Sequence, residues 1–122
     1  MWTFYQYPSC STCRSAKKWL EAQNIEVTAV HIVDAPPSRD EIERLWHASG
    51  LDLKRFFNTS GGSYRALKLK DTYAALSEDA RLDLLAADGK LLKRPILTNG
   101  AQVTLVGFKQ PEWEEVLGGG TP

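Results

Sequence analysis

A pair of cysteines separated by two residues is the feature that most constrains this chain. Cys10 and Cys13 form this Cys-x-x-Cys pair, and the chain has no other cysteine. An aromatic, strand-like run over 2–7 precedes the pair, and an amphipathic run over 14–23 follows it. Cys-x-x-Cys at a strand-to-helix junction is typical of redox-active dithiols. The pair therefore predicts thiol chemistry, although it says little about the substrate.

Composition places the chain among single globular domains. Its 122 residues suit one domain, and its 43% hydrophobic and 25% charged residues are typical of a protein with a packed core. The 15 basic and 15 acidic residues cancel, so we expect no direct nucleic-acid binding. We also expect no membrane span and no signal peptide. The chain should then be a cytoplasmic monomer in a reducing compartment, where disulfides are usually transient.

The hydrophobic pattern predicts a β-α-β unit around the cysteines. The run over 2–7 forms the first strand, the helix ends near Asn24, and the β-branched run over 25–33 forms the second strand. A connection through one helix makes the two strands parallel and the crossover right-handed.

The middle of the chain carries helical patterns and no strand pattern. A capping box predicts a helix in which the Ser38 hydroxyl caps the start and Glu41 reaches back, and Gly50 fits its end. We expect the region from about 38 to 90 to form a helical insertion. Its further predicted helical segments cover 51–57, 64–69 and 77–87.

The last third of the chain predicts a hairpin followed by a helix. Strand-like runs over 96–98 and 102–106 flank Asn-Gly at 99–100, a pair that suits the positive-φ positions of a type I′ turn. Pro111 suits the first turn of a last helix over 112–117.

This order of elements predicts an α/β protein with a thioredoxin-like fold. The sheet is expected to be mixed, with the parallel pair of strands joined to an antiparallel hairpin. Residues 1–117 should form the single domain, and residues 118–122 should form a flexible tail.

The predicted helix start gives the two thiols different roles. If the helix begins near Ser11, Cys10 lies at its N-cap, where free backbone N–H groups and the helix dipole favour a thiolate. Cys13 lies most of a turn inside the helix and should be less exposed. We therefore predict that Cys10 attacks and that Cys13 resolves the mixed disulfide. Ser11 and Thr12, in the same turn, are predicted to contact the substrate.

Two alternative interpretations of the cysteines stay open. Both could be small buried hydrophobic residues, or they could belong to a zinc site. A zinc site needs further Cys or His ligands at short spacing, whereas the only histidines are His31 and His47, sixteen residues apart. The strand-Cys-x-x-Cys-helix context favours the redox pair, and we predict no bound metal.

A second informative string is Lys-Arg-Pro-Ile at 93–96. A proline just before a strand cannot donate a hydrogen bond to the sheet, and it belongs to the residue type that adopts cis bonds. In thioredoxin-like folds such a proline packs against the cysteine pair. Pro95 would then place Arg94 near Cys10, where it could stabilise a thiolate or hold an oxyanion. The alternative is an exposed arginine beside a turn.

With these residues, the chain resembles the arsenate reductase (ArsC)/Spx family of thioredoxin-like proteins over nearly its whole length. The resemblance implies a four-stranded mixed sheet with an inserted helical subdomain, a catalytic Cys10 and an anion-holding Arg94. The segments that carry it are 5–20, 36–41, 58–64 and 93–96.

The chain departs from the pattern of the glutathione- and glutaredoxin-linked arsenate reductases. Those enzymes carry an arginine in the loop where this chain has Asn58, Thr59 and Ser60, and a histidine where it has Gln6. They carry another arginine near the last strand, where this chain has Val106, Gly107 and Phe108, and the nearby Lys109 offers only a point charge. Losing two of three guanidinium groups removes bidentate oxyanion contacts, so we expect arsenate to be a poor substrate. By analogy with the family, residues 58–60 border the site and are predicted to bind substrate.

The resemblance implies two functions. The first is a cytosolic thiol–disulfide oxidoreductase without a bound cofactor. Its Cys10–Cys13 disulfide would be reduced by a small thiol such as glutathione or bacillithiol, or by a thioredoxin or glutaredoxin system. The second, implied by Spx, is a redox-sensing regulator that binds the RNA polymerase α subunit. Spx-type chains continue with a longer basic tail, whereas this sequence ends five residues after Leu117, and this favours the oxidoreductase.

Overall fold

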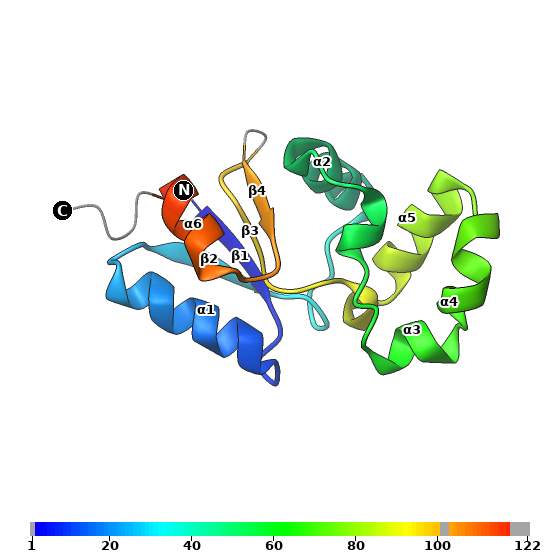
Figure 1. The fold of residues 1–122 in the computed structure, drawn as a ribbon, viewed down its shortest axis with the longest axis horizontal. Helices are drawn as coiled ribbons and strands as arrows, with labels where there is room; N and C mark the ends of the chain where they lie inside the picture. The colour runs from blue at the N-terminus through cyan, green and yellow to red at the C-terminus, as the bar shows by residue number, and fades with distance from the viewer. Residues whose placement is uncertain (1, 101–102, 118–122) are drawn as a thin grey trace.

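A four-stranded mixed sheet organises the fold, which the computed structural model describes for residues 2–100 and 103–117 (Figure 1). In spatial order its strands are β2 (Val27–His31), β1 (Trp2–Gln6), β3 (Ile96–Thr98) and β4 (Thr104–Val106). β1 and β2 are parallel, whereas β3 is antiparallel to both β1 and β4. The predicted fold class, a mixed sheet with a parallel pair and an antiparallel hairpin, is confirmed. The predicted tail over 118–122 lies outside the described residues.

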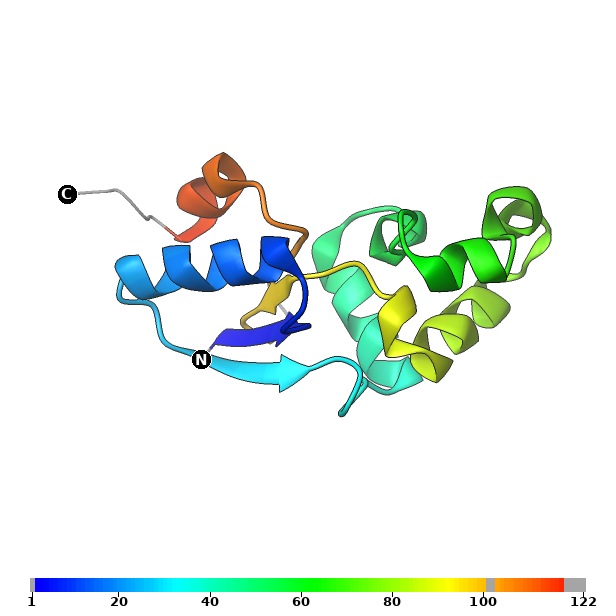
Figure 2. The same cartoon turned by 90° about the horizontal axis from the view of Figure 1, so that it is seen from below.

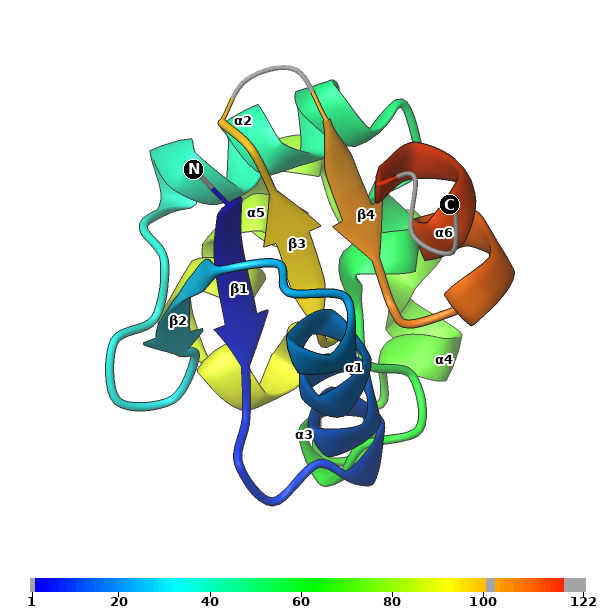
Figure 3. The ribbon, with the colours of Figure 1, turned by 90° about the vertical axis from the view of Figure 1, so that its left-hand side faces the viewer.

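The helices divide between the two faces of the sheet (Figure 3). α1 (Ser11–Ala22) and α6 (Gln110–Leu117) cover one face, and a helical insertion between β2 and β3 packs against the other. Within the described residues, no helix has the length and apolar character needed to cross a membrane. The insertion contains α2 (Arg39–Ser49), α3 (Gly62–Ala66), α4 (Leu69–Thr72), α5 (Glu78–Ala87) and the 3₁₀ turns η1 (Leu53–Phe56), η2 (Tyr73–Ala75) and η3 (Gly89–Leu91).

Alternate strand residues supply a hydrophobic core on each face of the sheet, because successive side chains of a strand point to opposite sides. The core under α1 and α6 contains three strand residues, Phe4, Leu97 and Leu105. The core under the insertion contains the strand residues Tyr5, Ile96 and Val106. The sheet is therefore a buried middle layer. It holds the start of α1 close to the segment before β3, which runs between the sheet and the insertion (Figure 2).

The capping box at the start of α2 is only half formed. The Ser38 hydroxyl accepts a hydrogen bond from the Glu41 N–H at 3.1 Å, as predicted. The Glu41 carboxylate instead accepts from the Tyr5 hydroxyl at 2.7 Å and from the Arg44 guanidinium at 2.5 and 3.0 Å. The prediction that Glu41 reaches back is wrong, because a cation is a stronger hydrogen-bond partner than a neutral backbone N–H. Burial and the Glu41 carboxylate raise the pKa of Tyr5, which keeps its hydroxyl protonated as the donor that joins β1 to α2.

The helix predicted over 64–69 is two shorter helices. Lys68 has a left-handed backbone conformation, with φ 53°, and separates α3 from α4. Tyr64 and Leu69 are both buried, as their apolar pattern predicts, but Tyr64 lies in α3 and Leu69 lies in α4. A lysine gives no sequence signal for this conformation, which glycine and asparagine adopt far more often.

The β3–β4 hairpin is confirmed, but its connection is longer than a two-residue turn. Thr98 pairs with Thr104, so the connection covers 99–103. Asn99 does not have a positive φ, and its side-chain oxygen accepts a hydrogen bond from the Val103 N–H at 2.9 Å. The type I′ prediction is wrong because this side chain closes a wider loop.

Gly89 is required where η3 crosses the chain after β2. A Cβ added to Gly89 would lie 1.9 Å from the Ile32 carbonyl oxygen, a backbone atom that cannot rotate away. We expect Gly89→Ala to lower the free energy of unfolding by about 3 kcal/mol or more. Chemical denaturation measures this change. Gly62→Ala is the matched control, because its Cβ would meet nothing within 4 Å. Equal unfolding midpoints for the two variants would contradict the prediction.

Candidate active site

Cys10 occupies the N-cap of α1, and Cys13 lies in the first turn of the same helix. Both residues are free thiols. The Cys13 N–H donates to Cys10 Sγ at 3.3 Å, so this sulfur takes the place that a serine or aspartate oxygen takes in an ordinary N-cap. Cys10 is partly exposed, whereas Cys13 is 1% exposed. A substrate can therefore reach Cys10 directly, and Cys13 lies behind it.

The surroundings of the two sulfurs shift their pKa values in opposite directions. Partial burial alone would raise the pKa of Cys10. Hydrogen bonds from the Cys13 thiol, the Cys13 N–H and the Arg94 guanidinium outweigh burial and lower that pKa. Burial, the largest cause, and the neighbouring Cys10 sulfur together raise the pKa of Cys13 to about 12. Near neutral pH, thiolate character is therefore concentrated on Cys10.

Arg94 reaches Cys10 from the segment before β3. Its Nη1 donates to the carbonyl oxygens of Lys90 at 2.8 Å and Leu92 at 3.3 Å. Its guanidinium carbon lies 5.3 Å from the centre of the Tyr7 ring. These contacts fix the plane of the guanidinium group, whose charge and N–H groups lower the pKa of Cys10. The structure therefore places Arg94 near Cys10, as predicted from the sequence.

Pro95 joins the site through its backbone. The Arg94–Pro95 peptide bond is cis, and the Pro95 carbonyl accepts a hydrogen bond from the Gly107 N–H at 2.8 Å. Gly107 has φ 75°, a conformation that favours glycine. Its carbonyl accepts a hydrogen bond from the buried Trp113 indole N–H at 3.0 Å. These two bonds hold the loop over 107–109 beside Arg94.

A cavity of about 450 Å³ opens next to Arg94, between α1, η1 and this loop. Thr12, two residues after Cys10, contributes to its wall, whereas Ser11 is exposed in the same turn. The wall contains four cationic residues and no acidic residue, which suits an anionic group of a ligand. Its lining residues are Thr12, Arg55, Lys93, Arg94, Val106, Gly107, Phe108 and Lys109.

The other predicted binding residues, in the loop after η1, do not line this cavity. The Asn58 N–H donates to the Leu91 carbonyl at 2.7 Å, and the Ser60 carbonyl accepts from the Arg65 guanidinium at 2.9 Å. Thr59 lines two neighbouring cavities instead. The loop is thus held to the insertion, and its predicted contact with the substrate stays a prediction.

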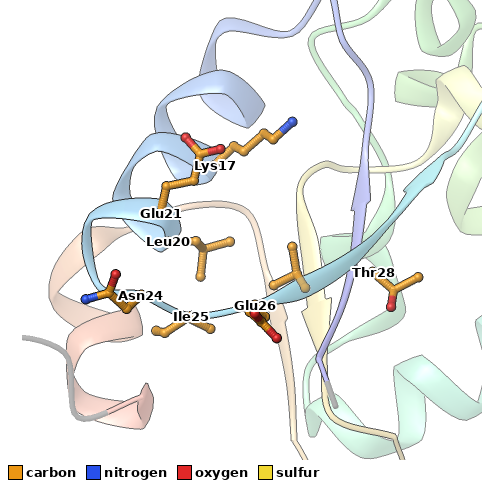
Figure 4. A pocket seen from close by; sticks show the side chains of 8 residues that line it. Lys17, Leu20, Glu21, Asn24, Ile25, Glu26 and Thr28 are labelled. Atoms are coloured by element: carbon orange, nitrogen blue, oxygen red, sulfur yellow. The ribbon is translucent and has the colours of Figure 1, made fainter.

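A larger cavity, of about 560 Å³, lies at the other end of α1 from Cys10 (Figure 4). It is lined from Lys17 onward, away from both cysteines, whereas the smaller cavity includes Thr12 and Arg94 next to Cys10, so the smaller cavity is the candidate site. Its lining residues are Lys17, Leu20, Glu21, Asn24, Ile25, Glu26, Val27 and Thr28.

Arg55 and Lys93 line this cavity but were not predicted as residues of the site from the sequence. The structure brings them together with Lys109, although the three come from separate parts of the chain. One sequence signal was available, because the segments over 53–70 and 89–109 contain basic residues and no acidic residue.

Comparisons with known proteins agree with this fold and site. The model of the ArsC family matches residues 5–116. The chain belongs to the ArsC family. The resemblance inferred from the sequence is therefore confirmed over nearly the whole chain.

Curated relatives in and around the ArsC family include regulators. The uncharacterized protein YusI of Bacillus subtilis is 56% identical, over 93% of this chain and 95% of its own length. The regulatory protein MgsR of the same species is 32% identical, over 90% of this chain and 85% of its own. The global transcriptional regulator Spx of Streptococcus pyogenes is 29% identical, over 92% and 81%.

Solved structures of ArsC-type proteins share the whole fold. An ArsC family related protein from Bacteroides fragilis has a TM-score of 0.90 and 47% identity, covering 94% of this chain and 96% of that one. An arsenate reductase from Vibrio cholerae has a TM-score of 0.79 and 28% identity, covering 97% and 96%. Enzymes and regulators therefore share this architecture, and the choice between the two functions has to come from the site itself.

Proposed function

We propose that this ArsC-family protein is a cytosolic thiol–disulfide oxidoreductase, with Cys10 as nucleophile and Cys13 as resolving thiol. The observation that supports it most directly is the opposite environment of the two sulfurs. Cys10 is accessible, at a helix N-terminus, and has a lowered pKa, whereas Cys13 is buried and has a raised pKa. An attacking thiol needs the first environment, and a thiol held back until the mixed disulfide has formed suits the second.

The proposed cycle is two successive thiol–disulfide exchanges. The Cys10 thiolate attacks one sulfur of the substrate disulfide, forming a mixed disulfide as the other substrate sulfur leaves. Cys13 then attacks Cys10 Sγ, and its proton passes to the second substrate sulfur as that sulfur leaves. The substrate gains two electrons, and the protein is left with a Cys10–Cys13 disulfide. Two molecules of a small thiol such as glutathione or bacillithiol, or the dithiol of one thioredoxin-type protein, return the two electrons and become a disulfide.

Arg94 has two roles in this proposal. It stabilises the Cys10 thiolate before attack, and its charge favours the thiolate that leaves the substrate. Ser11, Thr12 and Pro95 are proposed to contact the substrate around the reacting sulfurs. The anionic groups of the substrate would lie in the cavity beside Arg94.

Alkylation at graded pH tests the lowered pKa of Cys10. We expect its rate of reaction with iodoacetamide to reach half its maximum below the ordinary thiol pKa of about 8.5, because the thiolate is the reactive form. Cys13 should stay unmodified over the same range, since its pKa is about 12. Arg94→Gln should move the Cys10 profile to higher pH, because it removes a hydrogen bond and a positive charge.

Arg14→Gln is the control for this experiment. Arg14 lies on the same helix, but its Nη1 donates to the Pro8 carbonyl at 2.9 Å and its side chain is exposed. It should leave the Cys10 profile unchanged. The proposal would be abandoned if both cysteines were inert, or if Cys10 reacted only at the pH of an unperturbed thiol.

A redox-sensing regulator is the second candidate, because the curated relatives include the regulators MgsR and Spx. In that case the Cys10–Cys13 pair would act as the switch for binding the RNA polymerase α subunit. Capture of the purified α subunit by oxidised and reduced protein separates the two candidates. Redox-dependent capture without turnover of any disulfide would reverse the ranking.

A further inference from the structure

The chain has no net charge, but its charges are distributed unevenly. The segments over 53–70 and 89–109 contain nine of the 15 basic residues and no aspartate or glutamate. The start of α1 and the helix α3, which belongs to the first of these segments, both lie at the lower side of the molecule in Figures 1 and 3. These basic residues are Lys54, Arg55, Arg65, Lys68, Lys70, Lys90, Lys93, Arg94 and Lys109.

Three adjoining cavities of the described chain share cationic residues and lead away from the nucleophile. The cavity beside Arg94 shares Arg55 and Lys93 with a second cavity, of about 390 Å³. The second shares Lys54 and Thr59 with a third, of about 490 Å³. We call the three together the cationic trough. The remaining residues that line its third cavity are Tyr64, Arg65, Lys68, Lys70 and Asp71.

The cations of the trough are available to a ligand. Within residues 2–100 and 103–117, no ion pair joins Arg55, Lys68, Lys70, Lys93 or Lys109 to a carboxylate. Three carboxylates of α2 and α5, in contrast, surround a single arginine of α2: Glu43, Asp79 and Asp83 pair with Arg39. Unpaired like charges repel one another, and a bound anion would relieve this repulsion.

We propose that the cationic trough binds an acidic segment of a protein substrate whose disulfide reacts at Cys10. This inference rests on the proposed oxidoreductase function and names its substrate class. A small thiol would fill the cavity beside Arg94 and leave the other two cavities without a ligand. An extended chain can place its disulfide at Cys10 while its carboxylates reach Lys68 and Lys70.

A nucleic acid fits the trough less well than an acidic protein segment does. It carries no disulfide for Cys10 to attack. Two carboxylates, Asp52 and Asp71, also line the second and third cavities and interrupt the row of cations. A regular phosphate backbone would meet both of them, whereas a peptide can place its acidic residues opposite the cations alone.

Chromogenic peptides test the proposal. A glutamate-rich peptide with one cysteine, joined in a mixed disulfide to thionitrobenzoate, is compared with the same peptide carrying glutamine for glutamate. At low salt we expect kcat/KM to be about tenfold higher for the acidic peptide, and this preference should fall as salt screens the charges. Lys68→Asn/Lys70→Gln should remove most of the preference without slowing the glutamine peptide. Asparagine is chosen because it tolerates the left-handed conformation of Lys68.

Lys17→Gln/Lys18→Gln is the matched control, because it removes the same charge from α1, outside the trough. It should leave the preference intact. Equal rates for the two peptides, with normal dependence on Cys10, would overturn the trough proposal and leave the oxidoreductase standing. Equal losses in both double variants would also overturn it, since net charge alone would then explain the preference.

If no disulfide is turned over, the oxidoreductase proposal fails. Binding measurements then test the trough proposal separately. Fluorescence anisotropy of a labelled acidic peptide with serine for cysteine then reports on the trough directly. Binding that Lys68→Asn/Lys70→Gln weakens about tenfold would support the trough. Absent binding, or tighter binding of a single-stranded oligonucleotide of equal charge, would overturn it.

Discussion

Replacing Cys10 with serine is expected to lower turnover of every disulfide substrate by about a thousandfold or more. The serine hydroxyl stays protonated near neutral pH and cannot form a disulfide. The fold should survive, because serine is a favoured N-cap residue and its oxygen can accept the hydrogen bond from the Cys13 N–H. Equal unfolding midpoints for the variant and wild type would show that the loss is chemical rather than structural.

The measurement compares arsenate, a glutathione mixed disulfide and a protein disulfide side by side. We expect arsenate to be the weakest substrate, because Arg94 is the guanidinium group that lowers the pKa of Cys10 and the two further arginines of the family pattern are missing. Ser15→Ala, at an exposed position of α1, serves as the control and should retain full activity. Residual activity in Cys10→Ser would contradict the assigned nucleophile. Robust arsenate turnover by wild type would instead show that Arg55, Lys93 and Lys109 replace the missing family arginines.

The positions and the different burial of the two cysteines could be predicted because they depend on local structure. A strand followed by a helix fixes Cys10 at the N-cap and turns Cys13 inward, whatever the rest of the chain does. Arg94 needed one further step, namely the knowledge that a proline before a strand packs near such a pair. The mixed sheet followed from the same local patterns, since a helical crossover and a hairpin each fix the direction of the next strand.

The cationic wall could not be predicted in this way. Arg55 comes from a 3₁₀ turn of the insertion, Lys93 from the segment before β3, and Lys109 from the loop before α6. These residues meet only because the insertion packs against the sheet, and this packing depends on many buried side chains rather than on a local pattern. One of the two partners of Glu41, Tyr5, was equally out of reach of a local pattern, because it lies 36 residues away in the sequence.

Replacing Cys13 with alanine is expected to stop the cycle after its first step. Cys10 should still attack, because the backbone N–H of residue 13 and Arg94 still favour its thiolate. Without a resolving thiol, the mixed disulfide should persist, and steady-state turnover should fall by about a hundredfold. Mass spectrometry under non-reducing conditions should then show the protein carrying one substrate thiol on Cys10.

Alanine is preferable to serine at this position, because Cys13 is 1% exposed and a buried hydroxyl without a partner would destabilise the helix start. Adding glutathione separates two versions of the mechanism. If Cys13→Ala remains trapped in its presence, the resolving role of Cys13 is required. If glutathione restores turnover to the wild-type rate, the external thiol resolves the mixed disulfide, and Cys13 acts only as a hydrogen-bond donor that lowers the pKa of Cys10.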